Sequence, residues 1–268
     1  MTTEYTGTGD PKRSMELLWN LQVRKRRGPK PRLTVDQIVR GAIAVADAEA
    51  LSALSMRRVA DELNVATMSL YTYVPGKAEL IDVMLDTVSG ETARPDREPG
   101  QWRAALEQIA RENWALYHRH PWVLQVAAYR PPMGPRIIAK YEYELGAVEG
   151  IGLSDVEMDS VLTLVLGYTA GAARGSVEAG QAEQQTGVSD AEWWEANAPL
   201  LEQVFDGDRF PVAARVGAAA GEAYGAAFAP AYAFEFGLDR VLDGIGLLVG
   251  ARTARGRGRL PRNDRRPD

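Results

Sequence analysis

The stretch from Ser55 to Lys77, SMRRVADELNVATMSLYTYVPGK, constrains the fold of this chain more than any other. Its apolar residues follow helical spacing in two short runs, and a turn at Asn64-Val65-Ala66 separates them. Two short helices joined by a tight turn form a helix-turn-helix. The residues that open the second helix are slender enough to enter a DNA major groove, namely Ala66, Thr67, Met68 and Ser69. The stretch therefore predicts a DNA-binding motif.

Helices on both sides complete a three-helix core around this motif. Thr34-Val35-Asp36-Gln37 has the pattern of a capping box that opens a helix over residues 35–48, and Ser55 caps the next helix. Another helix with an apolar stripe follows over residues 77–88. We therefore expect a helix-turn-helix domain over residues 34–92.

The net charge of −5 hides an uneven distribution of charge. Residues 11–32 contain eight Lys or Arg residues and a single acid, whereas residues 33–251 contain 16 basic and 31 acidic residues. A basic arm beside a DNA-binding motif, with an acidic body behind it, is the asymmetry expected of a DNA-binding protein.

The basic arm is expected to span residues 1–33 and to be largely disordered, with a short helix between Met15 and Val23. Its glycine and prolines favour an extended course after that helix. Arg26 and Arg27 can then follow phosphates or enter a minor groove. The alternative is an arm that is merely a solvated tail.

A family resemblance is visible in these residues. The segment LSMRRVADELNVATMSLYTYVPGKAELIDVML resembles the DNA-binding domain of the tetracycline-repressor (TetR) family of bacterial regulators. The shared elements are Arg57-Arg58-Val59-Ala60, the turn, Leu70-Tyr71, Tyr73-Val74 and Lys77. The preceding segment ELLWNLQVRKRRGPKP resembles an N-terminal extension in a subgroup of the family. One departure is Ala66, because the family often has a capping Ser or Thr there, a cap typically worth ~1 kcal/mol.

The motif and the resemblance together assign roles to individual residues. Arg57 is placed to reach a base edge, whereas Arg58 should meet a phosphate or pair with an acid. The hydroxyl groups after the turn can donate to phosphates, with core packing as the alternative for the two tyrosines. Lys77 is a phosphate contact by resemblance to the family. The expected DNA contacts are Arg57, Arg58, Thr67, Met68, Ser69, Tyr71, Thr72, Tyr73 and Lys77, together with Arg26 and Arg27.

Residues 93–252 are predicted to form a second, larger helical domain. Capping boxes at Ser154 and Ser189 open two of its helices, and the first of these is almost wholly apolar from Val161 to Ala173. A helix that is apolar on all sides must be buried on all sides. This helix carries a glycine every four residues, at Gly167, Gly171 and Gly175. Because residues 238–250 repeat its character, we expect a four-helix bundle across a two-fold axis, which is where TetR relatives dimerise.

The larger domain is rich in big aromatic side chains, which line ligand pockets in many helical bundles. For any one of them, ordinary core packing is the alternative. The candidate effector contacts are Trp114, Tyr117, His118, Trp122, Tyr129, Tyr141, Tyr168 and Trp194. The two histidines share no metal-site pattern with a carboxylate, so neither a metal nor a cofactor is expected. Tetracycline-binding members place a metal-ligating histidine where this sequence has Val126, which argues against a metal-chelated tetracycline.

Composition narrows the functional class. The chain has no cysteine, no apolar run of the ~18 residues that a membrane span needs, and a polar start, so we expect a soluble cytoplasmic protein. Residues 253–268 should form a disordered Arg-rich tail. We expect an all-α homodimeric repressor that binds a palindromic DNA operator and is released by a small apolar or aromatic effector. The alternatives are an activator or a ligand-independent regulator of the same fold. An all-α enzyme is disfavoured because no catalytic constellation is present.

Overall fold

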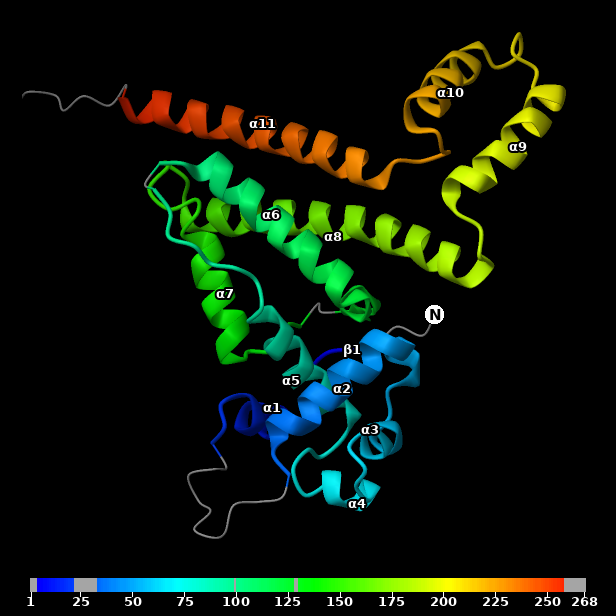
Figure 1. Cartoon of the computed structure of the whole chain (residues 1–268). Helices are drawn as coiled ribbons and strands as arrows, with labels where there is room; N and C mark the ends of the chain where they lie inside the picture. The colour runs from blue at the N-terminus through cyan, green and yellow to red at the C-terminus, as the bar shows by residue number, and fades with distance from the viewer. Residues whose placement is uncertain (1–3, 22–32, 99, 128–129, 258–268) are drawn as a thin grey trace, which may run out of the picture.

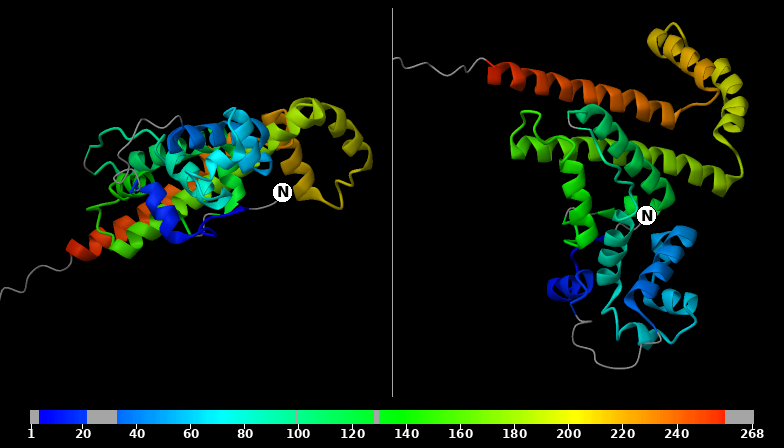
Figure 2. Two further views of the ribbon diagram at one scale, coloured as in Figure 1. Left: turned by 90° about the horizontal axis from the view of Figure 1, so that it is seen from below. Right: turned by 60° about the vertical axis from the view of Figure 1, so that its left-hand side comes forward.

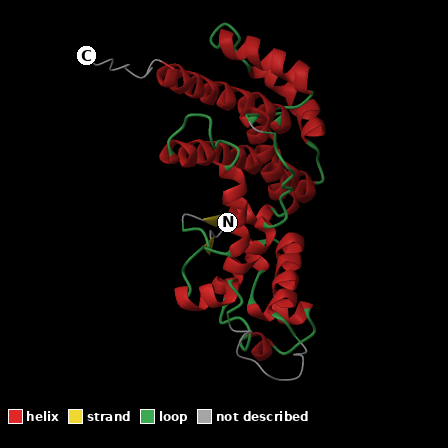
Figure 3. Cartoon of the chain, turned by 90° about the vertical axis from the view of Figure 1, so that its left-hand side faces the viewer, coloured by secondary structure: helices red, strands yellow, loops and turns green. Residues whose placement is uncertain are grey.

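The computed structural model describes residues 4–21, 33–98, 100–127 and 130–257, and its fold is all-α as the sequence predicts. A head of short helices lies below a body of longer ones (Figure 1). The head contains α1 (Pro11–Leu18), α2 (Val35–Glu49), α3 (Met56–Glu62), α4 (Thr67–Leu70) and α5 (Lys77–Ser89). The body contains α6 (Trp102–Arg119), α7 (Pro135–Leu145), α8 (Asp155–Thr186), α9 (Asp190–Val204), α10 (Pro211–Tyr224) and α11 (Pro230–Arg257). Two 3₁₀ helices, η2 (Leu51–Ala53) and η3 (Pro121–Gln125), and two short strands, β1 (Glu4–Tyr5) and β2 (Val126–Ala127), complete the described chain (Figure 3).

The head folds around the helix-turn-helix as its sequence predicts. Thr34 and Gln37 form the expected capping box of α2, and the Ser55 side chain accepts from the backbone N–H of Arg58 at the start of α3. Asn64 adopts a left-handed φ of 53° in the turn between α3 and α4. The head core is a single cluster that includes Ile38, Ala42, Val59, Leu70, Val74, Leu80 and Met84. The apolar sides of the head helices are therefore packed against one another, and this packing fixes the orientation of α4 within the head.

The body has a core of its own between α6, α8 and α11. It includes Leu106, Ile109, Leu162, Val165, Leu238 and Leu242. Ser154 opens α8 and Ser189 opens α9, each with the expected capping box. However, α8 is not buried on all sides within one chain, because Leu164 is 51% exposed. A Cβ added at Gly167, Gly171 or Gly175 would meet no atom within 4 Å. Among the described residues, no other helix approaches α8 closely at these glycines.

Helices α9 and α10 project beyond one end of the pair formed by α8 and α11 (Figures 1 and 2). Neither helix contains a buried residue. The two helices approach each other at one point, where a Cβ added at Gly221 of α10 would lie 2.8 Å from the Trp194 ring of α9. The excursion is thus a helical hairpin outside the body core.

The N-terminal residues differ from the disordered arm that we expected. Residues 4–21, called the N-terminal strap below, begin with β1, which pairs in parallel with β2 of the body. Asp10 then caps α1 by accepting from the backbone N–H groups of Lys12 and Arg13, and Leu17 and Leu18 join the head core. The sequence hides this fold because the strap is held by backbone groups as much as by side chains. Residues 22–32, which contain six of the eight Lys or Arg residues of the basic arm, lie outside the described residues.

Three buried carboxylates on α5 dock the strap and the body. The Oε1 atom of Glu79 accepts from the backbone N–H of Asp10 at 3.0 Å, and Asp82 accepts from the Ser14 hydroxyl at 2.9 Å. Asp86 accepts from the first backbone N–H groups of α7, those of Arg136 and Ile137, at 3.0 Å each. Burial raises the pKa of Asp82, although its hydrogen bonds from Ser14 and Gly7 act against this increase.

Asp82→Asn tests this unusual docking. A carboxyl whose pKa is raised on folding opposes folding once it is ionised, so the contribution of Asp82 to wild-type stability should fall as pH rises above the ordinary value of 3.8. The amide cannot ionise. The stability of Asp82→Asn relative to the wild type should therefore increase over that pH range and then stay constant. Urea unfolding at a series of pH values measures the difference. The exposed Asp61→Asn is the control, and parallel stability curves for Asp82→Asn and wild type would contradict the account.

Candidate DNA-binding and effector sites

One side of the recognition helix α4 packs on the head core, and the other side is exposed to solvent. Leu70 and Val74 are fully buried in the head core, whereas Met68 is 74% exposed and Tyr71 46% exposed. Ser69 and Thr72 are also exposed, and Thr67 is half-buried. Tyr73 differs from its neighbours because it packs against the head core. The N-cap residue of α4 is Ala66, so no N-cap side chain accepts a hydrogen bond from the first backbone N–H groups of this helix.

The adjacent arginines of α3 have different surroundings. Arg57 is exposed and makes no hydrogen bond or ion pair with the described residues. The Arg58 Nη2 atom lies 2.6 Å from Glu49 and 2.8 Å from Glu62. The Glu49 and Glu62 carboxylates raise the pKa of Arg58, and the hydrogen bond that Arg58 donates to Glu49 lowers the pKa of Glu49. Of the two roles expected for Arg58, the structure has the pairing with acids, which ties the end of α2 to α3.

The remaining expected DNA contacts lie at the start of α5 and in the basic arm. The Lys77 Nζ atom donates to Glu4 Oε1 of the N-terminal strap at 2.7 Å, and both side chains are about one-third exposed. Lys77 therefore fastens the strap in this structure. Arg26 and Arg27 lie outside the described residues.

Three of the candidate effector contacts come together in the body. Trp114 of α6 stacks on Phe234 of α11 with ring centroids 4.2 Å apart, and its ring lies 4.6 Å from that of His118. Tyr168 of α8 also stacks on Phe234, with ring centroids 6.2 Å apart. Phe234 was missed from sequence, because its helical spacing with Leu238 signals only a core position. These four residues are called the aromatic cluster below.

The structure separates the other candidates from this cluster. Trp122 is fully buried in the head core, and its indole N–H donates to Asp47 at 2.8 Å. Tyr141 donates to Asp159 between α7 and α8, and Trp194 belongs to the α9–α10 hairpin. Burial and the nearby Glu144 charge raise the pKa of Tyr117 to about 12. Tyr129 lies outside the described residues.

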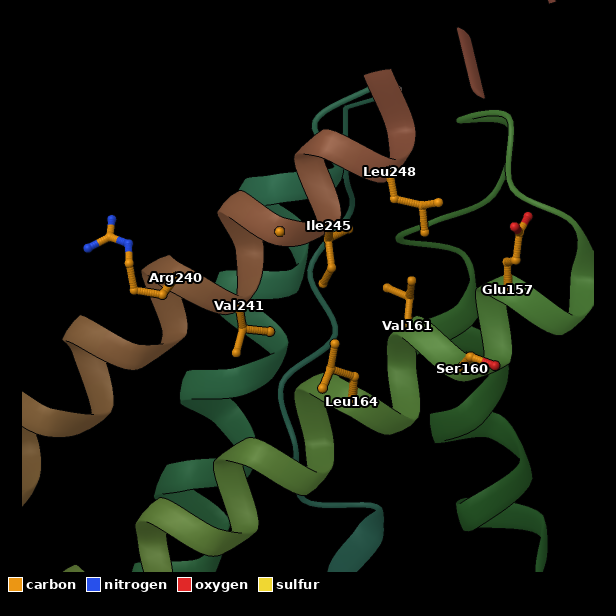
Figure 4. Close-up of a pocket in the computed structure, with 9 residues that line it drawn as sticks. Glu157, Ser160, Val161, Leu164, Arg240, Val241, Ile245 and Leu248 are labelled. Carbon is orange, nitrogen blue, oxygen red and sulfur yellow. The ribbon is translucent and has the colours of Figure 1, made fainter. Parts of the chain in front are cut away.

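Two grooves open between α8 and α11. The first has a volume of about 380 Å³ and is walled by apolar side chains, including Val161, Leu164, Val241, Ile245 and Leu248 (Figure 4). The second has a volume of about 880 Å³ and is lined by Tyr168 of the aromatic cluster and by the α8 glycines. The described residues contain no group of acids and histidines that could hold a metal ion. No described helix is both long enough and apolar enough to cross a membrane.

An exposed recognition helix on a compact head, joined to a helical body, defines a helix-turn-helix regulator of transcription. A family model described as "Tetracyclin repressor-like, C-terminal domain" matches residues 94–249. The chain is 48% identical over 252 residues to the HTH-type transcriptional repressor DrrR1 of Streptomyces coeruleorubidus, covering 94% of this chain and 91% of the relative. The chain belongs to the TetR family, and it is a transcriptional repressor rather than an enzyme.

Two solved structures and a further sequence relative agree with this assignment. Apo ActR from Streptomyces coelicolor is 26% identical with a TM-score of 0.65, covering 83% of this chain and 99% of that one. ActR in complex with actinorhodin is 28% identical with a TM-score of 0.67, covering 82% of this chain and 98% of that one. An HTH-type transcriptional regulator from Saccharopolyspora erythraea is 32% identical over 188 residues, covering 69% of this chain and 80% of the relative.

Proposed function

We propose that the chain is a homodimeric repressor that binds a palindromic operator and is released by a small aromatic or apolar effector. The observation that carries the DNA-binding part is the exposed row on α4 beside the unpaired Arg57. Met68 offers an apolar contact to a thymine methyl group, and Arg57 offers a guanidinium to a base edge. The buried Leu70 and Val74 hold this row rigidly, so little order has to be gained when DNA binds.

A second copy of the chain is the proposed occupant of the face formed by α8 and α11. Large apolar side chains project from this face, with Leu164 51%, Phe236 54% and Leu247 79% exposed. The smaller groove, which has Leu164 in its wall, lies between the same two helices. Packing this face against its own copy would complete a four-helix bundle with two-fold symmetry. Two recognition helices related in this way match half-sites about one DNA turn apart, or a multiple of one turn.

The larger groove is the proposed effector site. Its volume of about 880 Å³ falls within the range of ~300–1,000 Å³ typical of small-molecule sites. Tyr168 in its wall stacks on Phe234, which in turn stacks on Trp114, so an aromatic molecule would lie beside aromatic side chains. The complex of ActR with actinorhodin supports a small-molecule site in this fold. Effector binding would favour a spacing of the recognition helices that no longer matches the half-sites.

Arg57→Ala should lose sequence discrimination and keep the fold. An exposed guanidinium that reads a base edge contributes ~1–3 kcal/mol of preference for its own site. Fluorescence anisotropy with an operator selected from random duplexes, and with a scrambled duplex, measures the preference. Arg58→Ala is the matched variant, and it should lower the melting temperature because it breaks the bridge between α2 and α3. Equal loss on both duplexes would reduce Arg57 to a phosphate contact.

Leu164→Glu should produce monomers. A charge on the exposed α8–α11 face would be buried without a partner in the dimer, whereas the single chain leaves this side chain half exposed. Sedimentation velocity distinguishes dimer from monomer, and circular dichroism confirms that the helices remain. Val204→Glu, at an 80% exposed position on α9, is the control. A normal dimer for Leu164→Glu would place the interface elsewhere.

Effector binding should quench tryptophan fluorescence, and Trp114→Phe should remove most of the quenching. The phenylalanine keeps an aromatic ring against Phe234, so operator binding without effector should persist, while more effector should be needed for release. A panel of polycyclic aromatic compounds, titrated with and without chelator, supplies the measurement. Trp193→Phe on α9 is the control. Release that chelator abolishes would contradict an effector bound without metal.

A further inference from the structure

The His120 side chain lies between two carboxylates where the head meets the body. Its Nδ1 atom is 2.8 Å from Asp47 Oδ1 and 3.0 Å from Asp47 Oδ2. Its Nε2 atom is 2.9 Å from Glu91 Oε2. Asp47 belongs to α2 of the head, Glu91 follows α5, and His120 is the C-cap residue of α6 in the body. The imidazole therefore spans the junction, and its side chain is only 6% exposed.

With both acids ionised, only the protonated ring satisfies this geometry. A neutral imidazole has one N–H group and one lone pair, so one of its nitrogens would present a lone pair to a carboxylate oxygen. The imidazolium donates at both nitrogens, and such charge-assisted hydrogen bonds are among the stronger ones in proteins. The two acids lie on opposite sides of the ring, and no metal-binding group was found at this place among the described residues.

The other polar groups around the bridge agree with a charged ring. Arg119 Nη1 donates to Glu91 Oε2 at 3.1 Å, and the Trp122 indole N–H donates to Asp47 Oδ1 at 2.8 Å. Two carboxylates thus face one guanidinium and one imidazole, and their charges balance only when the imidazole is protonated. Burial raises the pKa of Glu91, but the hydrogen bonds from His120 and Arg119 outweigh it and leave this pKa below the ordinary range.

We propose that His120 is a positioning residue that, as an imidazolium, fastens α2 of the head to the end of α6. Helix α6 also carries Trp114 and His118 of the aromatic cluster, so it runs from the proposed effector site to this bridge. The bridge exists only while both ring nitrogens carry protons. A head without the bridge must be ordered when DNA binds, which weakens operator binding. The link to operator binding rests on the proposed function, whereas the charged bridge does not.

Nitrogen NMR of the histidine rings tests the charged bridge in the wild-type chain. The sequence contains two histidines, so ¹⁵N-labelled histidine gives two ring systems, and His118→Gln assigns them. We expect both ring nitrogens of His120 to carry protons, in slow exchange with solvent because the ring is buried. A neutral His120 tautomer would overturn the proposal.

Operator titrations test the positioning role. His120→Gln and the milder Glu91→Gln should each weaken binding to the selected operator several-fold. Glu202→Gln, at an exposed position on α9, is the matched control. An imidazolium by NMR with unchanged operator affinity in both bridge variants would refute the positioning role. If Arg57→Ala also left binding unchanged, the proposed DNA contact would fail separately, because neither outcome alters the NMR result.

Discussion

The burial of carboxylates on α5 is the constraint on which the arrangement of the molecule depends. Burying an acid without a partner is expensive, so each one must find hydrogen-bond donors in the folded chain. Glu79 and Asp82 find them in the N-terminal strap, and Asp86 finds them at the start of α7. Helix α5 belongs to the head by sequence, yet its acids are paired by the N-terminal strap and by the start of α7 in the body. Head and body are therefore linked by polar contacts as well as by a continuous chain.

The bridge at His120 follows the same logic at the other end of α5. Asp47 and Glu91 would also be uncompensated acids if the end of α6 did not bring an imidazole and Arg119 between them. In both places the head presents acids and another segment supplies donors. Such contacts have discrete made and broken states, and contacts of this kind would suit the proposed change in the spacing of the recognition helices.

Much of the fold was predictable because its signals are local. Capping boxes at Thr34, Ser154 and Ser189, and the turn before Ala66, each depend on residues within a few positions of one another. The recognition helix could be found for the same reason. Its exposed face also follows from sequence, because the residues buried beneath it, Leu70 and Val74, are four apart.

The rest of the candidate site depends on contacts that sequence spacing does not reveal. The pairing of Arg58 with Glu49 joins different helices, and nothing local distinguishes it from a phosphate contact. Trp114 and Trp122 look alike in sequence, yet one joins the aromatic cluster and the other lies in the head core. The order of residues 4–13 is not visible in the sequence, because backbone N–H groups, which all residue types except proline carry, dock much of this segment.

The strap also bears on how separable the parts of this repressor are. A helix-turn-helix that begins at Thr34 looks like a module that could be moved onto another effector domain. Cutting there would remove every strap donor that Glu79 and Asp82 use, together with the Glu4 partner of Lys77. An acidic face would then open beside the helices that must approach DNA phosphates. A chimeric regulator built from this chain should therefore carry the first 33 residues with its head. It should also keep the start of α7 from this chain, because the backbone N–H groups there donate to Asp86.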